Sequence, residues 1–150
     1  MAEMDPKPIR VLKVEDTADD ERLAMRALDK LGIAVEVDIA RDGAEAIVFL
    51  EQPVEQTAYR LVLLDLKLPK VSGIEVLETI RSSASTATLP VVVLTSSDER
   101  RDMAACYGGR CNAYVRKAVD YTEYMDAMRK TLEFWLIINL APPSPVSGSA

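Results

Sequence analysis

The sequence predicts an α/β fold in which a parallel sheet of five strands is covered by helices. Short apolar segments alternate five times with longer segments whose apolar residues recur at helical spacing. The segments 59–66 and 89–95 are apolar almost throughout, which is typical of strands buried on both faces of a parallel sheet. Such an alternation favours right-handed crossovers between neighbouring strands.

Each expected element has a local signal. Apolar and β-branched runs predict the strands, which we expect at residues 9–14, 34–40, 59–66, 89–95 and 112–117. Helical periodicity predicts the helices at 18–31, 42–50, 72–83, 98–107 and 120–139. Asp42 with Glu45, and Ser72 with Glu75, form capping boxes at two helix starts. Gly32 is expected to end the first helix.

The composition narrows the class of protein. The 150 residues carry a net charge of −6 and no basic cluster, which argues against nucleic acid as a direct partner. The N-terminus lacks the features of a signal peptide, and no apolar run could span a bilayer, so we expect a cytoplasmic protein without membrane contact. The absence of histidine excludes His-based triads and His-ligated metals. Two cysteines, Cys106 and Cys111, are expected as reduced thiols that pack as small apolar groups.

We expect one domain at residues 9–140. Residues 1–8 form a leader, and the Pro/Ser/Gly-rich residues 141–150 form a disordered tail. No internal repeat or linker is visible, so no second domain is expected.

Chemically distinctive residues stand at the ends of four expected strands. Because ligands of open α/β sheets bind outside the carboxyl ends of the strands, these side chains should converge. They are Glu15, Asp16, Asp65, Thr95, Ser96 and Lys117. Crowded carboxylates need a nearby cation, and Mg²⁺ prefers such oxygen ligands. A lysine and a hydroxyl beside them would bind the remaining oxygens of a phosphoryl group, so the pattern favours phosphoryl transfer.

Taken singly, each residue has a simpler interpretation. Glu15 and Asp16 could favour the start of the first helix by their charge, and Lys117 could be a surface lysine. The joint pattern at four strand ends favours the metal site instead. Asp19, Asp20 and Glu21 are different: we expect them to be first-turn surface charges.

Several motifs together resemble the receiver domain of bacterial two-component response regulators. They are "VED" (14–16), "LLDLKLP" (63–69), Gly73, "VVVLTS" (91–96) and "YVRK" (114–117). The resemblance spans almost the whole chain except both tails. It implies a flavodoxin-like, doubly wound sheet in the order 2-1-3-4-5 with five helices.

The resemblance also implies roles for individual residues. Asp65 would accept the phosphoryl group. Mg²⁺ would be held by Asp16, Asp65, the backbone carbonyl of Lys67 and, through water, Glu15. Phosphate contacts and the conformational switch would come from Thr95, Ser96, Lys117 and Tyr114, the last being the aromatic residue that changes rotamer when Thr95 moves.

A narrower resemblance lies toward the C-terminus. "CYGGRCNAYVRK" (106–117), "FWL" (134–136) and the Pro-containing tail are similar to single-domain regulators paired with cyanobacterial and bacterial phytochromes. The resemblance implies a histidine kinase as partner, namely a bacteriophytochrome.

The last helix is expected to pack on the core through one apolar stripe, formed by Tyr121, Tyr124, Met125, Met128, Leu132 and Trp135. The segment "FWLII" ends this helix and is apolar on every side, so it needs a second surface for burial. One possibility is that the C-terminal segment folds back over it. We favour a two-fold homodimer interface at the fourth helix, the fifth strand and the last helix, built on Phe134, Trp135, Ile137 and Ile138.

Two residues depart from the family pattern. Receivers usually place a proline, preceded by a cis bond, after the lysine; Ala118 stands there instead. We expect Lys117 to point into the site nevertheless. Lys13 occupies a position where the family usually has an apolar residue, and it could either extend to an edge or pair with a carboxylate.

Two other functions fit part of this pattern. A Mg²⁺-dependent phosphohydrolase with an aspartyl-phosphate normally needs a carboxylate two positions after the nucleophile, where Lys67 stands. An interaction module with a vestigial site is disfavoured by the complete acidic set. We therefore expect no turnover of an external substrate, although the domain would assist its own phosphorylation and dephosphorylation.

Overall fold

The structure is a computed structural model that describes residues 8–53 and 58–143. Most of the expected leader (1–8) and of the expected disordered tail (141–150) lies outside the described residues.

Five parallel strands form one sheet in the order β2-β1-β3-β4-β5. The strands are β1 (Ile9–Val14), β2 (Val35–Ala40), β3 (Leu61–Leu64), β4 (Val91–Thr95) and β5 (Ala113–Arg116). This order confirms the expected flavodoxin-like topology. Because all neighbouring strands are parallel, the carboxyl ends of the strands all lie at the same end of the sheet.

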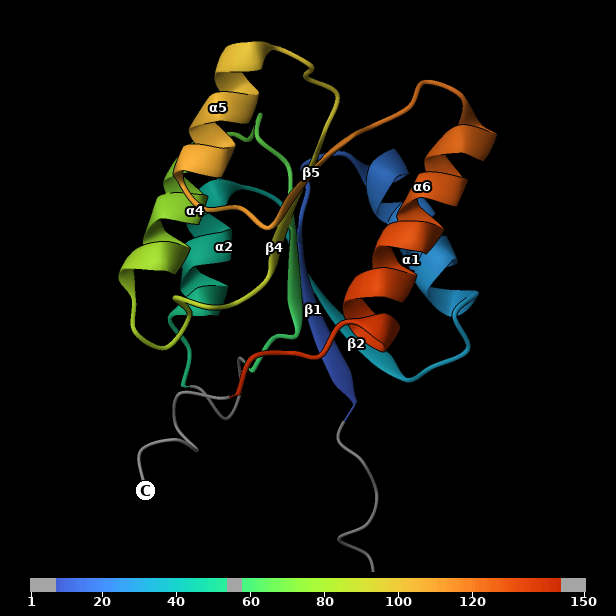
Figure 1. The fold of residues 1–150 in the computed structure, drawn as a ribbon, viewed down its shortest axis with the longest axis horizontal. Coiled ribbons are helices and arrows are strands. Elements are labelled where there is room, and N and C mark those ends of the chain that lie inside the picture. Colours follow the sequence, from blue (N-terminus) through green and yellow to red (C-terminus); the bar gives the residue numbers. More distant parts are fainter. Residues whose placement is uncertain (1–7, 54–57, 144–150) are drawn as a thin grey trace, which may run out of the picture.

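Helices cover both faces of the sheet (Figure 1). On one face lie α1 (Ala18–Asp29) and α6 (Tyr121–Glu133). On the other lie α2 (Gly43–Leu50), α4 (Gly73–Ser82) and α5 (Arg100–Gly108). Each face has its own core of buried apolar side chains.

The alternation of side chains along β1 decides which residues face which layer. Leu12 and Val14 pack in the core under α2, α4 and α5, whereas Val11 packs in the core under α1 and α6. Residues two apart in a strand share a face, so Lys13 and Glu15 follow Val11 toward α1 and α6. The strand thereby directs two ionisable side chains into the layer between α1 and α6.

Two of the three expected helix signals are present in the structure. Asp42 and Ser72 accept hydrogen bonds from the backbone N–H groups of Glu45 (2.7 Å) and Glu75 (3.3 Å), which confirms both caps. The expectation that Gly32 ends the first helix is wrong, because α1 ends at Asp29 with Lys30 as its C-cap. Gly32 lies two residues further on, in the following turn, where its φ of 71° favours glycine.

The C-terminal helix differs from the continuous helix expected at 120–139. After α6 the chain widens into the π-helical turn η2 (Phe134–Ile138), in which the N–H of Asn139 donates to the Phe134 carbonyl at 2.7 Å. Leu136 is the buried residue of this turn. Tyr121, which we assigned to the core-facing stripe of the helix, is 49% exposed, and Arg26 donates to its hydroxyl.

Cys106 and Cys111 are free and buried, as expected. Burial raises the pKa of the Cys106 thiol to about 12, with further increments from Cys111 and Asp102. Such a thiol stays protonated and behaves as a small apolar group.

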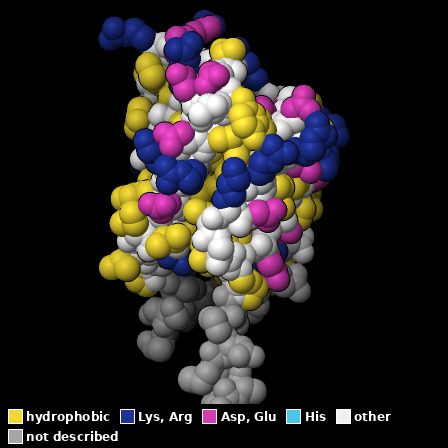
Figure 2. All heavy atoms as spheres, turned by 90° about the vertical axis from the view of Figure 1, so that its right-hand side faces the viewer, with side chains coloured by type: hydrophobic (Ala, Val, Ile, Leu, Met, Phe, Trp, Pro, Cys, Tyr) yellow, Lys and Arg dark blue, Asp and Glu magenta, His cyan; other side chains and the backbone are white. Residues whose placement is uncertain are grey.

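Charged side chains of both signs are interspersed on the face formed by α1 and α6 (Figure 2). Among the described residues, no helix is long and apolar enough to cross a membrane.

Gly73 lies against the backbone of Asp65, so replacing this glycine tests how closely the fold constrains that position. A Cβ at Gly73 would lie 2.3 Å from the Asp65 carbonyl oxygen and 2.6 Å from the Leu66 Cα, both backbone atoms. We expect Gly73→Ala to lower the free energy of unfolding by about 2 kcal/mol, as overpacking commonly does. Urea denaturation measures the change.

The matched control is Gly108→Ala, because a Cβ at this helical glycine meets nothing within 4 Å. Its stability should stay within about 0.5 kcal/mol of the wild type or rise slightly. Equal losses in the two variants would show that Gly73 is not under steric constraint.

Candidate functional site

Lys117 brings three strand ends together. Its Nζ lies 3.0 Å from Asp65 Oδ2 at the end of β3 and 2.9 Å from Glu15 Oε1 at the end of β1. The backbone N–H of Lys117 donates to the Thr95 carbonyl at 2.7 Å, which continues the pairing of β5 with β4. The Lys117–Ala118 bond is trans, since the described residues contain no cis peptide bond. The lysine thus points into the site without the proline that receivers usually have.

The acidic cluster of Glu15, Asp16 and Asp65 lies at this edge of the sheet. One carboxylate oxygen from each residue lies within 4.8 Å of the other two. Asp16 is exposed, whereas Glu15 is fully buried and Asp65 nearly so. Because hard divalent cations prefer carboxylate oxygens, this donor set suits one such ion, with Asp16 on the solvent side.

Lys13 pairs with Glu15 inside the protein. The lysine is 1% exposed, and its Nζ lies 2.9 Å from Glu15 Oε1. Of the two possibilities that the sequence left open, pairing with a carboxylate is therefore the one observed. Burial lowers the pKa of Lys13, and the Glu15 carboxylate partly offsets this effect.

Both oxygens of Glu15 are occupied by protein donors. Oε1 accepts hydrogen bonds from Lys13 and Lys117, and Oε2 accepts from the hydroxyl of Thr17 at 3.1 Å. Burial raises the pKa of Glu15, but Lys13 and Lys117 outweigh burial and bring the pKa down to about 2. Glu15 is therefore an ionised carboxylate at neutral pH, and its charge is neutralised from two sides.

Asp20 also belongs to this network, which corrects the expectation that it is only a surface charge. Its Oδ2 lies 2.6 Å from Lys117 Nζ, and its side chain is 26% exposed. The first turn of α1 carries Asp20 over the site, whereas Asp19 and Glu21 pair with Arg22 and Arg41 on the surface. No sequence signal separated the three, because their contacts depend on how α1 is rotated against the end of β5.

Lys117 is held by its three carboxylates. Burial alone would lower its pKa, but Asp20, Asp65 and Glu15 together raise the pKa above its ordinary value. Burial raises the pKa of Asp65, and Lys117 partly offsets that change. The backbone N–H of Lys67 donates to Asp65 Oδ1 at 3.2 Å, while the Lys67 side chain is exposed at the mouth of the site.

Tyr124 is a site residue that the sequence analysis assigned only to packing. Its hydroxyl is buried and has no hydrogen-bond partner among the described residues. Burial raises the pKa of Tyr124, and Asp20 adds the largest contribution of any charge. The charges of Asp20 and Lys117 therefore both act on this hydroxyl.

The hydroxyl residues of β4 occupy the same edge. Thr95 is buried, and its Oγ1 accepts from the N–H of Ser97 at 3.3 Å, whereas Ser96 is exposed. Tyr114 is half-buried against the core, and its hydroxyl donates to the Ser97 carbonyl at 2.9 Å. Tyr114 therefore holds the loop that follows Thr95.

The residues expected at a dimer interface are mostly exposed. Phe134, Ile137 and Ile138 have exposed fractions of 44%, 50% and 60%, while Trp135 is half-buried against the core under α1 and α6. Trp135 and Phe134 form an edge-to-face pair with ring centroids 5.1 Å apart.

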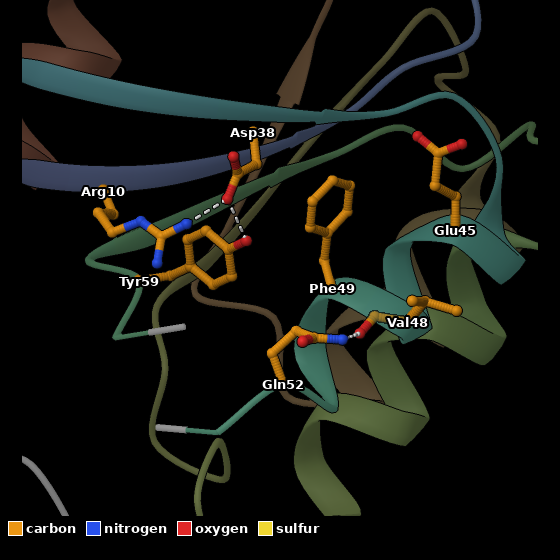
Figure 3. A pocket seen from close by; sticks show the side chains of 7 residues that line it. All are labelled: Arg10, Asp38, Glu45, Val48, Phe49, Gln52 and Tyr59. Carbon is orange, nitrogen blue, oxygen red and sulfur yellow. Dashed lines mark hydrogen bonds and ion pairs between the residues drawn. The ribbon is translucent and has the colours of Figure 1, made fainter. Parts of the chain in front are cut away.

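A separate cleft of about 310 Å³ lies beside α2 (Figure 3). Its polar groups satisfy one another: Asp38 accepts from Arg10 at 2.5 Å and from Tyr59 at 2.6 Å. The Arg10 guanidinium also stacks over the Tyr59 ring, 5.0 Å from its centre. None of Glu15, Asp65 and Lys117 lines this cleft, so the acidic edge of the sheet is the better candidate for chemistry.

The family model for the "response regulator receiver domain" matches residues 11–129. The chain belongs to the response regulator receiver family. The matched residues include every strand end that contributes to the acidic edge, so the candidate site lies within the receiver domain.

Several receivers are similar over nearly their whole length. The response regulator Rcp1 of Synechocystis is 36% identical over 91% of this chain and 95% of its own. The crystal structure of its Mn²⁺-bound form has a TM-score of 0.83, covering 91% of this chain and 100% of that one. The phosphorylated cyanobacterial phytochrome response regulator RcpA is 35% identical, with a TM-score of 0.85 and the same coverages. The bacteriophytochrome response regulator AtBRR is 39% identical, with a TM-score of 0.67, over 90% of this chain and 100% of that one.

The unpaired hydroxyl of Tyr124 leads to a stability prediction. Removing a buried hydroxyl that lacks a partner relieves a desolvation cost, so Tyr124→Phe should raise the free energy of unfolding by about 1 kcal/mol. The control is Tyr114→Phe, which removes a hydroxyl bonded to Ser97 and should cost about 1 kcal/mol. Urea denaturation of both variants checks the opposite signs; a loss in Tyr124→Phe would show that this hydroxyl has a partner in solution.

Proposed function

We propose that the protein is a single-domain response regulator that accepts a phosphoryl group on Asp65 from a partner histidine kinase. The observation that carries the proposal is the approach of Lys117 Nζ to within 3.0 Å of Asp65, beside three clustered carboxylates. An aspartate, an ammonium group and a divalent-cation site are the parts that phosphoryl transfer requires.

Mg²⁺ is the proposed metal, with Asp16, Asp65, the Lys67 carbonyl and, through water, Glu15 as its ligands. When bound, the ion neutralises charge on the transferring phosphoryl group. An Asp65 oxygen forms the new bond to phosphorus while the bond from phosphorus to the donor breaks, and the leaving group keeps that electron pair. Lys117 and the hydroxyls of Thr95 and Ser96 bind the phosphoryl oxygens.

The switch follows from the added charge. Phosphorylation brings about −1.5 to −2 charges, and Lys117 and Thr95 move toward them. Because Tyr114 holds the loop after Thr95 through Ser97, a shift of that loop repacks Tyr114. We infer that the surface of α5, β5 and α6 changes as a result.

The second part of the proposal concerns the identity of the partner kinase. Likeness to Rcp1, RcpA and AtBRR, which covers 91%, 91% and 90% of this chain, supports a bacteriophytochrome kinase as the partner. The proposal places the protein in the cytoplasm, names proteins as its partners, and assigns no role to nucleic acid or a membrane. It includes no turnover of an external substrate, because Lys67 stands where a phosphohydrolase would need an acid.

The signal would leave the domain through protein contacts or onward phosphotransfer. We propose a homodimer built on α5, β5, α6 and η2, with Phe134, Trp135, Ile137 and Ile138 at its centre. The exposure of three of these apolar side chains on one turn supports an interface there.

The phosphoacceptor is tested by intact mass. Incubation with Mg²⁺ and a small acyl-phosphate donor should add one phosphate to the wild type, and Asp65→Asn should abolish the adduct. Asp19→Asn, which changes an exposed aspartate, is the matched control and should keep the adduct. An unmodified wild type would support the vestigial interaction module, and turnover of external phosphoesters would support the phosphohydrolase.

The dimer is tested by sedimentation. At micromolar concentration the wild type should sediment as a dimer, and the double variant Ile137→Ser, Ile138→Ser should be monomeric because its apolar contact area is reduced. Val48→Ser, at a residue 58% exposed on α2, is the control and should remain dimeric. A monomeric wild type, with and without phosphorylation, would contradict the proposed interface.

A further inference from the structure

Lys13 has no role in the mechanism above, although it is one of the most buried residues of the protein. It is 1% exposed, and its side chain lies on the α1 and α6 side of the sheet, like Val11 and Glu15. Burying an ammonium group is costly unless an acid pairs with it. Here that acid is Glu15, whose Oε1 lies 2.9 Å away.

The two lysines on Glu15 differ in their freedom to move. Lys117 is shared among Glu15, Asp20 and Asp65, and it is the cation expected to follow the phosphoryl group. Lys13 has Glu15 as its one hydrogen-bond and ion-pair partner within residues 8–53 and 58–143. Without Lys13, a departing Lys117 would leave the buried carboxylate of Glu15 with no ammonium group in direct contact. The proposed Mg²⁺, which Glu15 reaches only through water, would then be the nearest cation, and such a loss of direct pairing is a large penalty.

Lys13 also changes the balance of charge at the site. Four carboxylates face two ammonium groups there, from Glu15, Asp16, Asp20 and Asp65 on one side and Lys13 and Lys117 on the other. A fixed positive charge beside the acidic cluster repels a metal cation and attracts the incoming phosphoryl anion.

We propose that Lys13 is a positioning residue that keeps Glu15 permanently paired, so that Lys117 is free to bind the phosphoryl group. The cost of this arrangement is weaker binding of the divalent cation. The inference rests on the proposed function and adds to it a residue that the receiver pattern does not contain.

The test is a double-mutant cycle of Lys13→Met, Glu15→Gln and the double variant. Calorimetric titration with Mg²⁺ alone should show Lys13→Met binding about tenfold more tightly than wild type, since one shielded unit charge is removed. Glu15→Gln should bind more weakly. The double variant, which restores the net charge, should return toward the wild-type Kd.

The second readout is phosphorylation at saturating Mg²⁺. Lys13→Met should react with the acyl-phosphate donor about tenfold more slowly, because Lys117 remains held by Glu15. Tighter metal binding with slower phosphorylation is a combination that general loss of structure would not produce. Lys70→Met removes an exposed lysine paired with Asp42 and, as the control, should change both quantities less than twofold.

The outcomes separate the two proposals. Unchanged or weaker Mg²⁺ binding in Lys13→Met overturns the role of Lys13, and so does an undiminished rate of phosphorylation. If Lys13→Met does not fold, the double variant decides: a Kd no tighter than that of Glu15→Gln overturns the role. A wild type that binds Mg²⁺ but forms no adduct contradicts the proposed function, while the calorimetric cycle still tests Lys13.

Discussion

The arrangement of the site depends on a fully buried carboxylate that is shared by two lysines. Glu15 lies where β1 leaves the sheet, and its Oε1 accepts from both Lys13 and Lys117 at 2.9 Å. An unpaired charge at this depth would be severely destabilising, so the lysines and Glu15 have to be ordered together. The position of Lys117 beside Asp65, and with it the proposed chemistry, follows from this requirement.

The order of the strands in the sheet brings the site residues together, although they are far apart in the sequence. The order β2-β1-β3-β4-β5 places the ends of β1 and β3 side by side, with β4 and β5 next along the sheet. Gly73 then lets α4 start directly against the backbone of Asp65, where any larger residue would collide. The nearly buried Asp65 is thereby held close to Lys117 and to the solvent-exposed Asp16. This arrangement suits a metal ion bound from the solvent side.

The sequence predicted the fold and most of the site because the strands, the helices and the residues at the strand ends produce periodic or local sequence patterns. Apolar runs located the strands, and strand ends located Asp65, Thr95 and Lys117. Asp20 and Tyr124 were assigned to the surface and to packing, because their contacts depend on how α1 and α6 are rotated against the sheet. Lys13 left two possibilities open. Its spacing from Glu15 places both side chains on one face of β1, but whether the lysine pairs there or extends to an edge depends on how deeply the helices bury that face. The π-helical turn after α6 had no signal in the apolar segment that forms it.

In the proposed switch, Lys117 exchanges its carboxylate partners for the phosphoryl group while Lys13 stays on Glu15. The most direct measurement is a crystal structure of the protein with Mg²⁺ and beryllofluoride, a phosphoryl mimic, on Asp65. We expect Lys117 Nζ to leave Asp20 and contact a fluoride, whereas Lys13 should keep its contact of about 2.9 Å with Glu15. A structure in which Lys117 remains on Asp20, or in which Lys13 releases Glu15, would contradict the proposed switch.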